Sequence, residues 1–396
     1  MAQDATELYN MYMEISQKIG QGDKPNYLVT LKEFEDNKKT FEGTFVEQMV
    51  NQSLSTLYSF VGDYDKALKT YQSIARKDQT VVDKGEVKDL KVADAKKTIL
   101  EEAKDHRIVI INENPHIPLH RAFTHSLLSG LKEQGFNHLA LEDLSVTEEE
   151  INERKYPIKR SGYYMLEPVF GDMVRTALQM DYELVCYDYH AFMELAQRDS
   201  MGVTYLKKIL DEDANAKILI HLFHEHVNEN DKTIGYWIKE LTGIDPLTIN
   251  QIDLTETGAP EYDNAYYTYI QEELSPKNSS VLIKGNENWV LPKRKGANDL
   301  QVIHPATTYK DGRPNWLFDV LDRKAYKVTT EDFDGKNNFL LQAFYKEELD
   351  TAIPVDQLWI KEVSKDVTLA LPKGAFTLKM VNVAGEVIKE WEVTVK

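Results

Sequence analysis

The strongest constraint on the fold of this chain comes from four short apolar runs in its sequence. Each of them ends abruptly in acidic and histidine side chains. They lie at 107–116, 138–143, 183–190 and 217–226. Short apolar runs between helical stretches are typical of parallel strands buried on both faces. In open parallel sheets, ligands bind just beyond the carboxyl ends of the strands. The polar residues at these ends are Glu113, His116, Glu142, Asp188, His190, His221, His224 and His226. We therefore expect a functional site at one edge of a sheet.

Helical segments alternate with these runs. Amphipathic or breaker-bounded stretches predict helices at 121–134, 171–180, 191–197, 204–211 and 233–242. Strands that alternate with helices imply right-handed crossovers and a parallel sheet. Two later runs, 280–284 and 299–305, are candidates for further strands. The sequence thus predicts the α/β class, with a mostly parallel sheet flanked by helices.

The two ends of the chain differ from this middle part. Residues 1–100 show helical spacing, and 57–71 resembles the middle of a tetratricopeptide hairpin. A single hairpin favours a helical cap on the next domain over a peptide-binding array, because a solenoid needs stacked repeats. Alternating runs separated by turns near the C-terminus predict a small antiparallel β domain. We expect a helical region at 1–100, an α/β core with the site at 101–325, and a β-rich accessory domain at 335–396.

Charge and composition limit the partners. The formal net charge of −18 disfavours nucleic acid, since no basic face would offset phosphate repulsion. No apolar stretch approaches the length of a membrane span. The single cysteine, Cys186, excludes an intrachain disulfide and is interpreted as a small buried hydrophobe. The first residues lack the parts of a signal peptide but resemble the start of a processed secreted chain. We expect an exported protein, periplasmic or at the cell surface, with the cytoplasm as the alternative.

The segment after the first apolar run has the residue types of a general-base site. Pro115 and Pro118 keep the backbone extended before the next helix begins. Glu113 and His116 are therefore expected near the strand end. A carboxylate beside a histidine raises the imidazole pKa and fixes its tautomer, which suits a general base near neutral pH. The alternative is that Glu113 caps the helix or pairs with Arg121.

The second and fourth runs supply further candidates. Glu142 ends an apolar strand, so it must be hydrogen-bonded, paired or metal-bound to offset desolvation, or else cap the following loop. In an extended chain His224 and His226 point to the same side. Together with His221 and Glu113 or Glu142, they are a candidate ligand set for zinc or another divalent metal. For His221 the alternative is a core histidine bonded to backbone.

Other polar residues are candidates for substrate binding. They are Arg121, Arg175, Asp188 and His190. Arg175 is a candidate for holding an anionic group, although pairing with Asp172 or Glu167 is the alternative. The sequence contains no Gly-x-Ser-x-Gly elbow, phosphate loop or dinucleotide fingerprint, which disfavours serine triads and nucleotide chemistry.

A resemblance to a known family rests on several of these residues. Residues 108–142 contain Glu113-x-x-His116, then a helix that begins His-Arg, then Gly135-Phe and Leu-Ala-Leu-Glu142. This pattern resembles the erythromycin-esterase-like and ChaN-like superfamily, which includes the TraB and Tiki proteins. Its members typically have Gly-Glu-x-x-His after the first strand and Leu-Glu at the end of the second. A later strand end with histidines corresponds to 217–226. The chain departs from the pattern at Asn112, where glycine is usual, and at Glu225, where the esterases often have asparagine.

The resemblance implies two kinds of function. One is a hydrolase of an ester, a lactone or an amide. In it His116 deprotonates a water, Glu113 orients the ring, Glu142 positions the water or holds a metal, and His224 or His226 stabilises the oxyanion. The other is a haem- or metal-binding protein without turnover, which would bind haem or a divalent metal such as zinc. A degenerate core between partner-binding modules is disfavoured, because unused buried charges at four strand ends would cost stability. We favour the hydrolase, with a small molecule as its substrate.

Overall fold

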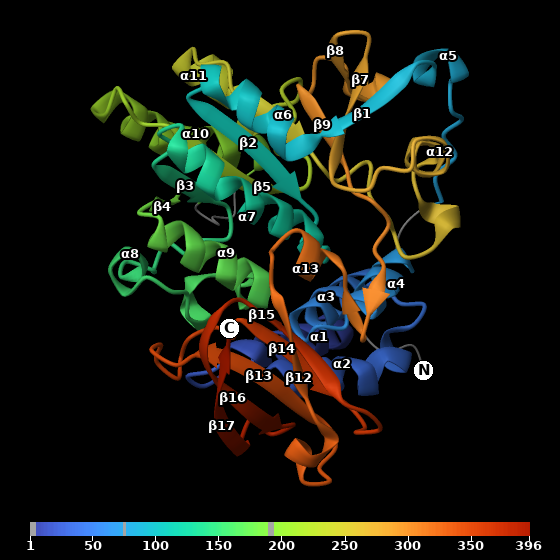
Figure 1. The fold of residues 1–396 in the computed structure, drawn as a ribbon, viewed down its shortest axis with the longest axis vertical. Helices are drawn as coiled ribbons and strands as arrows, with labels where there is room; N and C mark the ends of the chain where they lie inside the picture. Colours follow the sequence, from blue (N-terminus) through green and yellow to red (C-terminus); the bar gives the residue numbers. More distant parts are fainter. Residues whose placement is uncertain (1–4, 74–76, 189–193) are drawn as a thin grey trace.

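A central sheet organises the upper half of the molecule as drawn in Figure 1. The computed structural model describes residues 5–73, 77–188 and 194–396. The strands of this sheet are β1 (Leu90–Asp94), β2 (Ile108–Glu113), β3 (His138–Leu141), β4 (Glu183–Cys186), β5 (Ile218–Phe223), β6 (Leu247–Asn250), β7 (Ser280–Lys284), β8 (Glu287–Trp289) and β9 (Leu300–Ile303). The helices of this part are α6 (Ala95–Glu102), α7 (Pro118–Glu133), α8 (Ile151–Arg154), α9 (Pro168–Gln179), α10 (Leu195–Glu212), α11 (Ile234–Thr242) and α12 (Ala265–Glu273).

The strand order is β1-β7-β9-β6-β2-β5-β3-β4, and β8 pairs with β7. All pairs that link β9, β6, β2, β5, β3 and β4 are parallel. The pairs made by β7 are antiparallel. The predicted α/β class, with a mostly parallel sheet flanked by helices, is therefore confirmed. Because the parallel strands point the same way, their carboxyl ends lie at one edge of the sheet.

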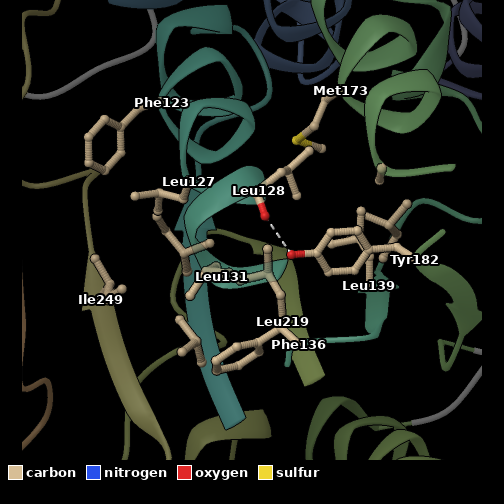
Figure 2. Close-up of a cluster of buried hydrophobic side chains, with 14 of the residues drawn as sticks. Phe123, Leu127, Leu128, Leu131, Phe136, Leu139, Met173, Tyr182, Leu219 and Ile249 are labelled. Carbon is tan, nitrogen blue, oxygen red and sulfur yellow. Dashed lines mark hydrogen bonds between the residues drawn. The ribbon is translucent and has the colours of Figure 1, made fainter. Parts of the chain in front are cut away.

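Both faces of this sheet are covered, which explains the unbroken apolar runs. The odd-numbered residues Val109 and Ile111 of β2 pack with side chains of α6, α7 and α9. The even-numbered apolar residues of the same strand pack with α10 and α11. Figure 2 shows the first of these cores, where the Tyr182 hydroxyl is buried and donates to the Leu128 carbonyl at 2.7 Å. With both faces covered, the strands β2 and β5 are made mainly of apolar residues.

The N-terminal helices pack against the C-terminal sheet. They are α1 (Ala5–Gln17), α2 (Tyr27–Phe41), α3 (Glu47–Phe60) and α4 (Tyr64–Gln72). The short α5 (Lys84–Val87) lies instead at the edge of the central sheet, where Val87 packs with Tyr266 and Trp289. Side chains of α1 to α4 share one core with Leu340, Ile353 and Trp359 from the C-terminal part. Figure 1 shows these blue helices directly against the red strands. No helix in the described ranges is long and apolar enough to cross a membrane.

The prediction that residues 1–100 are helical is wrong at 90–94. Strand β1 lies there and pairs antiparallel with β7, at the edge of the central sheet. An edge strand is bound mainly through its backbone, so its side chains need no clear alternation. Of its five residues only Leu90 is buried. The side-chain pattern therefore carried no signal for this strand.

The C-terminal part consists of antiparallel sheets. Its elements are β10 (Tyr309–Lys310), β11 (Arg313–Pro314), α13 (Trp316–Asp319), β12 (Lys324–Val328), β13 (Phe339–Tyr345), β14 (Asp356–Ile360), β15 (Val367–Leu371), β16 (Gly374–Asn382) and β17 (Val387–Val395). Strands β14-β13-β16-β17 form one sheet and β12-β15 another. Side chains from both sheets share a core. The predicted antiparallel β module is therefore present, and its strands begin at Lys324.

Gly62 allows the turn between α3 and α4 to lie directly against β14. Its φ is +77°, and a Cβ there would stand 2.4 Å from the carbonyl oxygen of Gln357. The Trp359 amide donates to the Val61 carbonyl at 3.0 Å. The side-chain amide of Gln357 donates to the Phe60 carbonyl at 2.6 Å. This glycine turn is the one that gives the hairpin its tetratricopeptide-like appearance.

We predict that Gly62→Ala lowers the free energy of unfolding by roughly 2–5 kcal/mol, since it adds left-handed strain and a backbone clash. The matched control is Gly43→Ala. Gly43 has a φ of +72° but nothing within 4 Å of an added Cβ, so only the strain of about 1–2 kcal/mol applies. Urea unfolding of both variants measures the difference. Equal losses would contradict the close approach of the turn to β14.

Candidate functional site

The carboxyl end of β2 carries a buried ion-pair cluster built around Arg121. From the first turn of α7, its Nε and Nη2 donate to the two carboxylate oxygens of Glu113 at 3.0 and 2.5 Å. Its Nη1 donates to Glu167 Oε2 at 3.4 Å. His221 Nε2, from β5, lies 2.9 Å from Glu113 Oε2. All four residues are buried. The structure thus contains the pairing of Glu113 with Arg121 that the sequence left as an alternative.

Burial sets the protonation of this cluster. Removal from water raises the pKa of Glu113 and of Glu167, and Arg121 opposes the shift in both. Burial would lower the pKa of Arg121, but the two carboxylates outweigh it and raise that pKa. Burial lowers the pKa of His221 to about 3, and Arg121 adds to the shift. The cluster is therefore a guanidinium between acids with a neutral imidazole beside it.

Arg121 also fixes the turn that carries His116. Its Nη2 donates to the Pro115 carbonyl at 2.7 Å. The His116 ring stacks on Tyr71 of α4, with the ring centroids 3.6 Å apart and the planes 13° apart. In the part of the chain that the structure describes, nothing hydrogen-bonds to this ring. Burial lowers the pKa of His116 to about 3, and His224 and Arg121 add to the shift. His116 is thus a neutral imidazole with free nitrogen atoms, held by its backbone and one ring face.

Glu142, directly after β3, joins three segments. Its Oε2 accepts the Phe223 amide at 2.7 Å, at the end of β5. Its Oε1 accepts Arg198 Nη2 at 2.7 Å, and Arg198 also donates to both oxygens of Asp188 at 2.6 and 2.8 Å. Burial raises the pKa of Glu142, while His226 and the Phe223 amide oppose the shift. The structure therefore brings the predicted Glu142 and Asp188 together on one guanidinium, whose side chain is 22% exposed.

The chain leaves the strand conformation at His224, and this separates the three histidines. Strand β5 ends at Phe223, and His224 has a φ of +50°. The Asn112 side-chain amide holds the His224 carbonyl at 2.6 Å. Two residues later, His226 Nδ1 lies 2.8 Å from Asp199 Oδ2, on α10. The prediction that His224 and His226 point to the same side assumed an extended chain. The chain is not extended at His224, so this geometry is absent.

The described structure gives no support to the metal site predicted at His221, His224 and His226. His221 faces the buried Glu113 cluster, whereas His226 is hydrogen-bonded to Asp199. Across residues 5–73, 77–188 and 194–396, no group of three or more His, Cys, Asp or Glu side chains is arranged to hold a metal ion. As they are arranged, these three side chains do not converge on one point where a divalent metal could bind.

One predicted substrate-binding residue, Arg175, is committed to a structural ion pair. Arg175 Nε and Nη2 donate to the two carboxylate oxygens of Glu348 at 2.6 and 2.7 Å, and Nη2 also donates to the Ile353 carbonyl. Arg175 is buried and joins α9 to the loop after β13. Its partner is therefore neither a ligand nor the predicted Asp172 or Glu167. His190 lies outside the described residues.

Several residues of this edge were not found from the sequence. Arg198 and Asp199 lie on α10, and Tyr71 lies on α4, far from the strand ends in sequence. Glu167 caps α9, because its Oε2 accepts the Phe170 amide at 2.9 Å. A glutamate directly before a proline at a helix start is a capping signal that could have identified it. The other contacts arise from tertiary packing and have no local signal.

Comparisons with known proteins leave the family open. No protein-family model matches the chain, and no curated protein matches it. One solved structure, described as "The structure of the type III effector HopBA1", is similar to it with a TM-score of 0.33 and 11% identity. The alignment covers 53% of this chain and 93% of that chain. A likeness of this size carries no argument about fold or function.

We predict that Arg121→Met destabilises the protein by about 3–5 kcal/mol, because it leaves Glu113 and Glu167 buried without a cation. The matched control is Arg160→Met. Arg160 is 49% exposed and pairs with Glu150 at 2.6 Å, so its loss is expected to cost within about 1 kcal/mol. Chemical denaturation gives both values. A small loss for Arg121→Met would mean that the acids are neutral in the folded protein.

We predict that Asp199→Asn lowers the pKa of His226. Burial alone would lower this pKa, and the hydrogen bond to Asp199 together with the charge of Glu142 raises it above 6.5. A histidine whose pKa is higher in the folded state than in the unfolded state stabilises the protein. This stabilisation is fully present below the pKa of the unfolded state and is lost as the pH rises through the pKa of the folded state. The free-energy difference between wild type and variant is therefore larger at about pH 5.5 than at about pH 9. An NMR titration of the imidazole Cε1–H signal checks the shift, and an unchanged pKa would contradict it.

Proposed function

We propose that this protein hydrolyses an ester, a lactone or an amide, with His116 as general base at the carboxyl edge of the parallel strands. One observation carries the proposal. The His116 ring has no hydrogen-bond partner among the described residues, and it lies at the edge that also carries Glu142, where His224 lowers its pKa. The resemblance of Glu113-x-x-His116 and Leu-Glu142 to the erythromycin-esterase-like superfamily agrees with it.

A neutral imidazole is the form that a general base requires. Its free nitrogen can accept a proton from water while the water oxygen attacks the carbonyl carbon of the substrate. Burial disfavours the imidazolium that results, as the pKa of His116 near 3 indicates. The proton transfer is therefore expected to occur together with formation of the tetrahedral oxyanion. The imidazolium and the oxyanion carry opposite charges and then stabilise each other.

Glu113 and Arg121 are positioning residues in this proposal. The sequence suggested that Glu113 orients the imidazole directly, but its carboxylate contacts Arg121 and His221 instead. Arg121 in turn holds the Pro115 carbonyl, one residue before His116. The influence of Glu113 on the base therefore passes through the guanidinium and the backbone of the turn.

Glu142 and His224 supply the remaining roles. The Glu142 carboxylate accepts one bond at each oxygen, and each oxygen has a further lone pair that can hold a water molecule. His224 is close enough to His116 to lower its pKa. An N–H group of His224 is then available to donate to the developing oxyanion. The alternative of haem or metal binding has no observation in its favour among the described residues.

We predict that His116→Ala lowers kcat/KM by about 100-fold or more, the usual contribution of a general base. The assay uses p-nitrophenyl butyrate, δ-valerolactone and a p-nitroanilide, each with and without chelator. His106→Ala is the matched control, since His106 precedes β2 at the opposite end of the strand, and its ring Nδ1 lies 3.1 Å from the Asp245 carbonyl oxygen. Circular dichroism confirms that both variants are folded.

The outcomes of this assay test the assignment of His116 as the base and the proposed substrate classes. Turnover that survives in His116→Ala, or falls equally in His106→Ala, contradicts the base assignment. A wild-type protein that turns over none of the three compounds contradicts the proposed substrate classes. In that case a haem titration followed by absorbance tests the binding alternative.

A further inference from the structure

A cavity lies on the α7 side of the sheet edge, where β7 begins and β9 ends. Its volume is about 290 Å³, at the lower end of the range for small-molecule sites. Leu119 and Phe123 of α7 and Trp316 of α13 give it apolar walls. Two acids and two lysines also line it, namely Asp94, Asp319, Lys96 and Lys277. Because these charges cancel, a neutral molecule with an apolar part suits the cavity.

Ser279, which lines this cavity and is 9% exposed, is hydrogen-bonded to a histidine. Its Oγ lies 2.9 Å from His304 Nδ1. The antiparallel register of β7 and β9 places these two residues opposite each other. Val281 packs with α6 and α7, and side chains two residues apart along a strand share a face. The edge-on contact of the His304 ring with Phe123, with 5.4 Å between the ring centroids, places His304 on that face too.

Gln251 fixes the tautomer of His304. Its side-chain Nε2 donates to the carbonyls of Asn112 and His120, at 2.7 and 3.2 Å. Its Oε1 is therefore the atom that lies 3.1 Å from His304 Nε2. An amide oxygen only accepts, so His304 carries its proton on Nε2 and its Nδ1 is an acceptor. The Ser279 hydroxyl then donates to Nδ1, which is the arrangement of a nucleophile, a base and an orienting group.

We infer that Ser279 is a nucleophile that takes an acyl group from a neutral ester bound in this cavity. The Ser279 oxygen attacks the carbonyl carbon of the ester while its proton passes to His304 Nδ1. The ester C–O bond then breaks, and the departing oxygen takes the proton from His304. The products of this step are the acylated serine and the free alcohol. Water that gives its proton to His304 in the same way releases the acid and restores the hydroxyl.

Burial limits which esters react. It lowers the pKa of His304 to about 3, so the ring is neutral and can accept the proton, but the imidazolium is costly. The reaction therefore favours an aryl ester, whose C–O bond breaks readily. The sequence has no elbow motif for such a serine, because the serine and the histidine come from neighbouring strands. This chemistry goes beyond the proposed hydrolysis, in which His116 activates water and no covalent intermediate forms.

The test is covalent labelling with phenylmethanesulfonyl fluoride, a neutral aromatic reagent from which the serine oxygen displaces fluoride. In parallel, p-nitrophenyl acetate tests acyl transfer after an acid quench. Intact mass gives the stoichiometry of each adduct, and peptide mass spectrometry locates it. The variants are Ser279→Ala and His304→Asn. The matched control is Ser126→Ala, since Ser126 lines the same cavity but donates to the Phe123 carbonyl at 2.7 Å.

We expect wild-type protein to carry the sulfonyl group and the acetyl group at Ser279. Ser279→Ala should lose both adducts, and His304→Asn should slow labelling by about 100-fold or more, the usual contribution of a general base. Ser126→Ala should be labelled like the wild type. Labelling should also persist in His116→Ala, which separates this site from the proposed hydrolysis. Circular dichroism confirms that each variant is folded.

Three results would overturn the inference. They are no adduct at Ser279 with either reagent, labelling of His304→Asn at the wild-type rate, and equal labelling of Ser279 and Ser126 in the wild type. If His304→Asn does not fold, the comparison of the two serines decides. Both line one cavity, and of the two the described structure hydrogen-bonds only Ser279 to a histidine.

Discussion

The buried pair of Glu113 and Arg121 is the interaction on which the arrangement of the sheet edge depends. It joins β2 to α7, and through Glu167 and His221 it also reaches α9 and β5. Burying such a pair gives little net stability compared with apolar packing. Its effect is geometric, because only one arrangement of these four elements satisfies all its charges. The turn that carries His116 is part of that arrangement through the Pro115 carbonyl.

Much of the central fold could be predicted because its strands are buried on both faces. In β2, β3 and β5 every residue is buried, so the apolar runs stand out. Two strands gave no such signal. The edge strand β1 is mostly exposed, and β6 has only four residues, of which Thr248 and Asn250 are polar. Backbone pairing with neighbouring strands determines where β1 and β6 lie in the sheet, and their side-chain patterns do not reveal it.

The site was predictable only where local sequence determines position. Glu113 is the last residue of β2, His116 comes three residues later, and Glu142 follows β3 directly, so all three lie at the expected edge. The histidine cluster at the end of β5 was misjudged, because one left-handed residue, His224, redirects the chain. Arg198 and Tyr71 contact the site from distant helices. Such contacts depend on how helices pack, which no short segment of sequence encodes.

The shared core of the first helices and the last strands has a consequence for synthesis of the chain. Side chains of α1 to α4 pack with Leu340, Ile353 and Trp359, which leave the ribosome after nearly all the rest of the chain. Until then the helices lack this part of their core, although Leu166 of the middle part also packs with them. Contacts between segments so distant in sequence slow folding. The helical segment is therefore expected to complete its packing only after residues 340–359 have been synthesised.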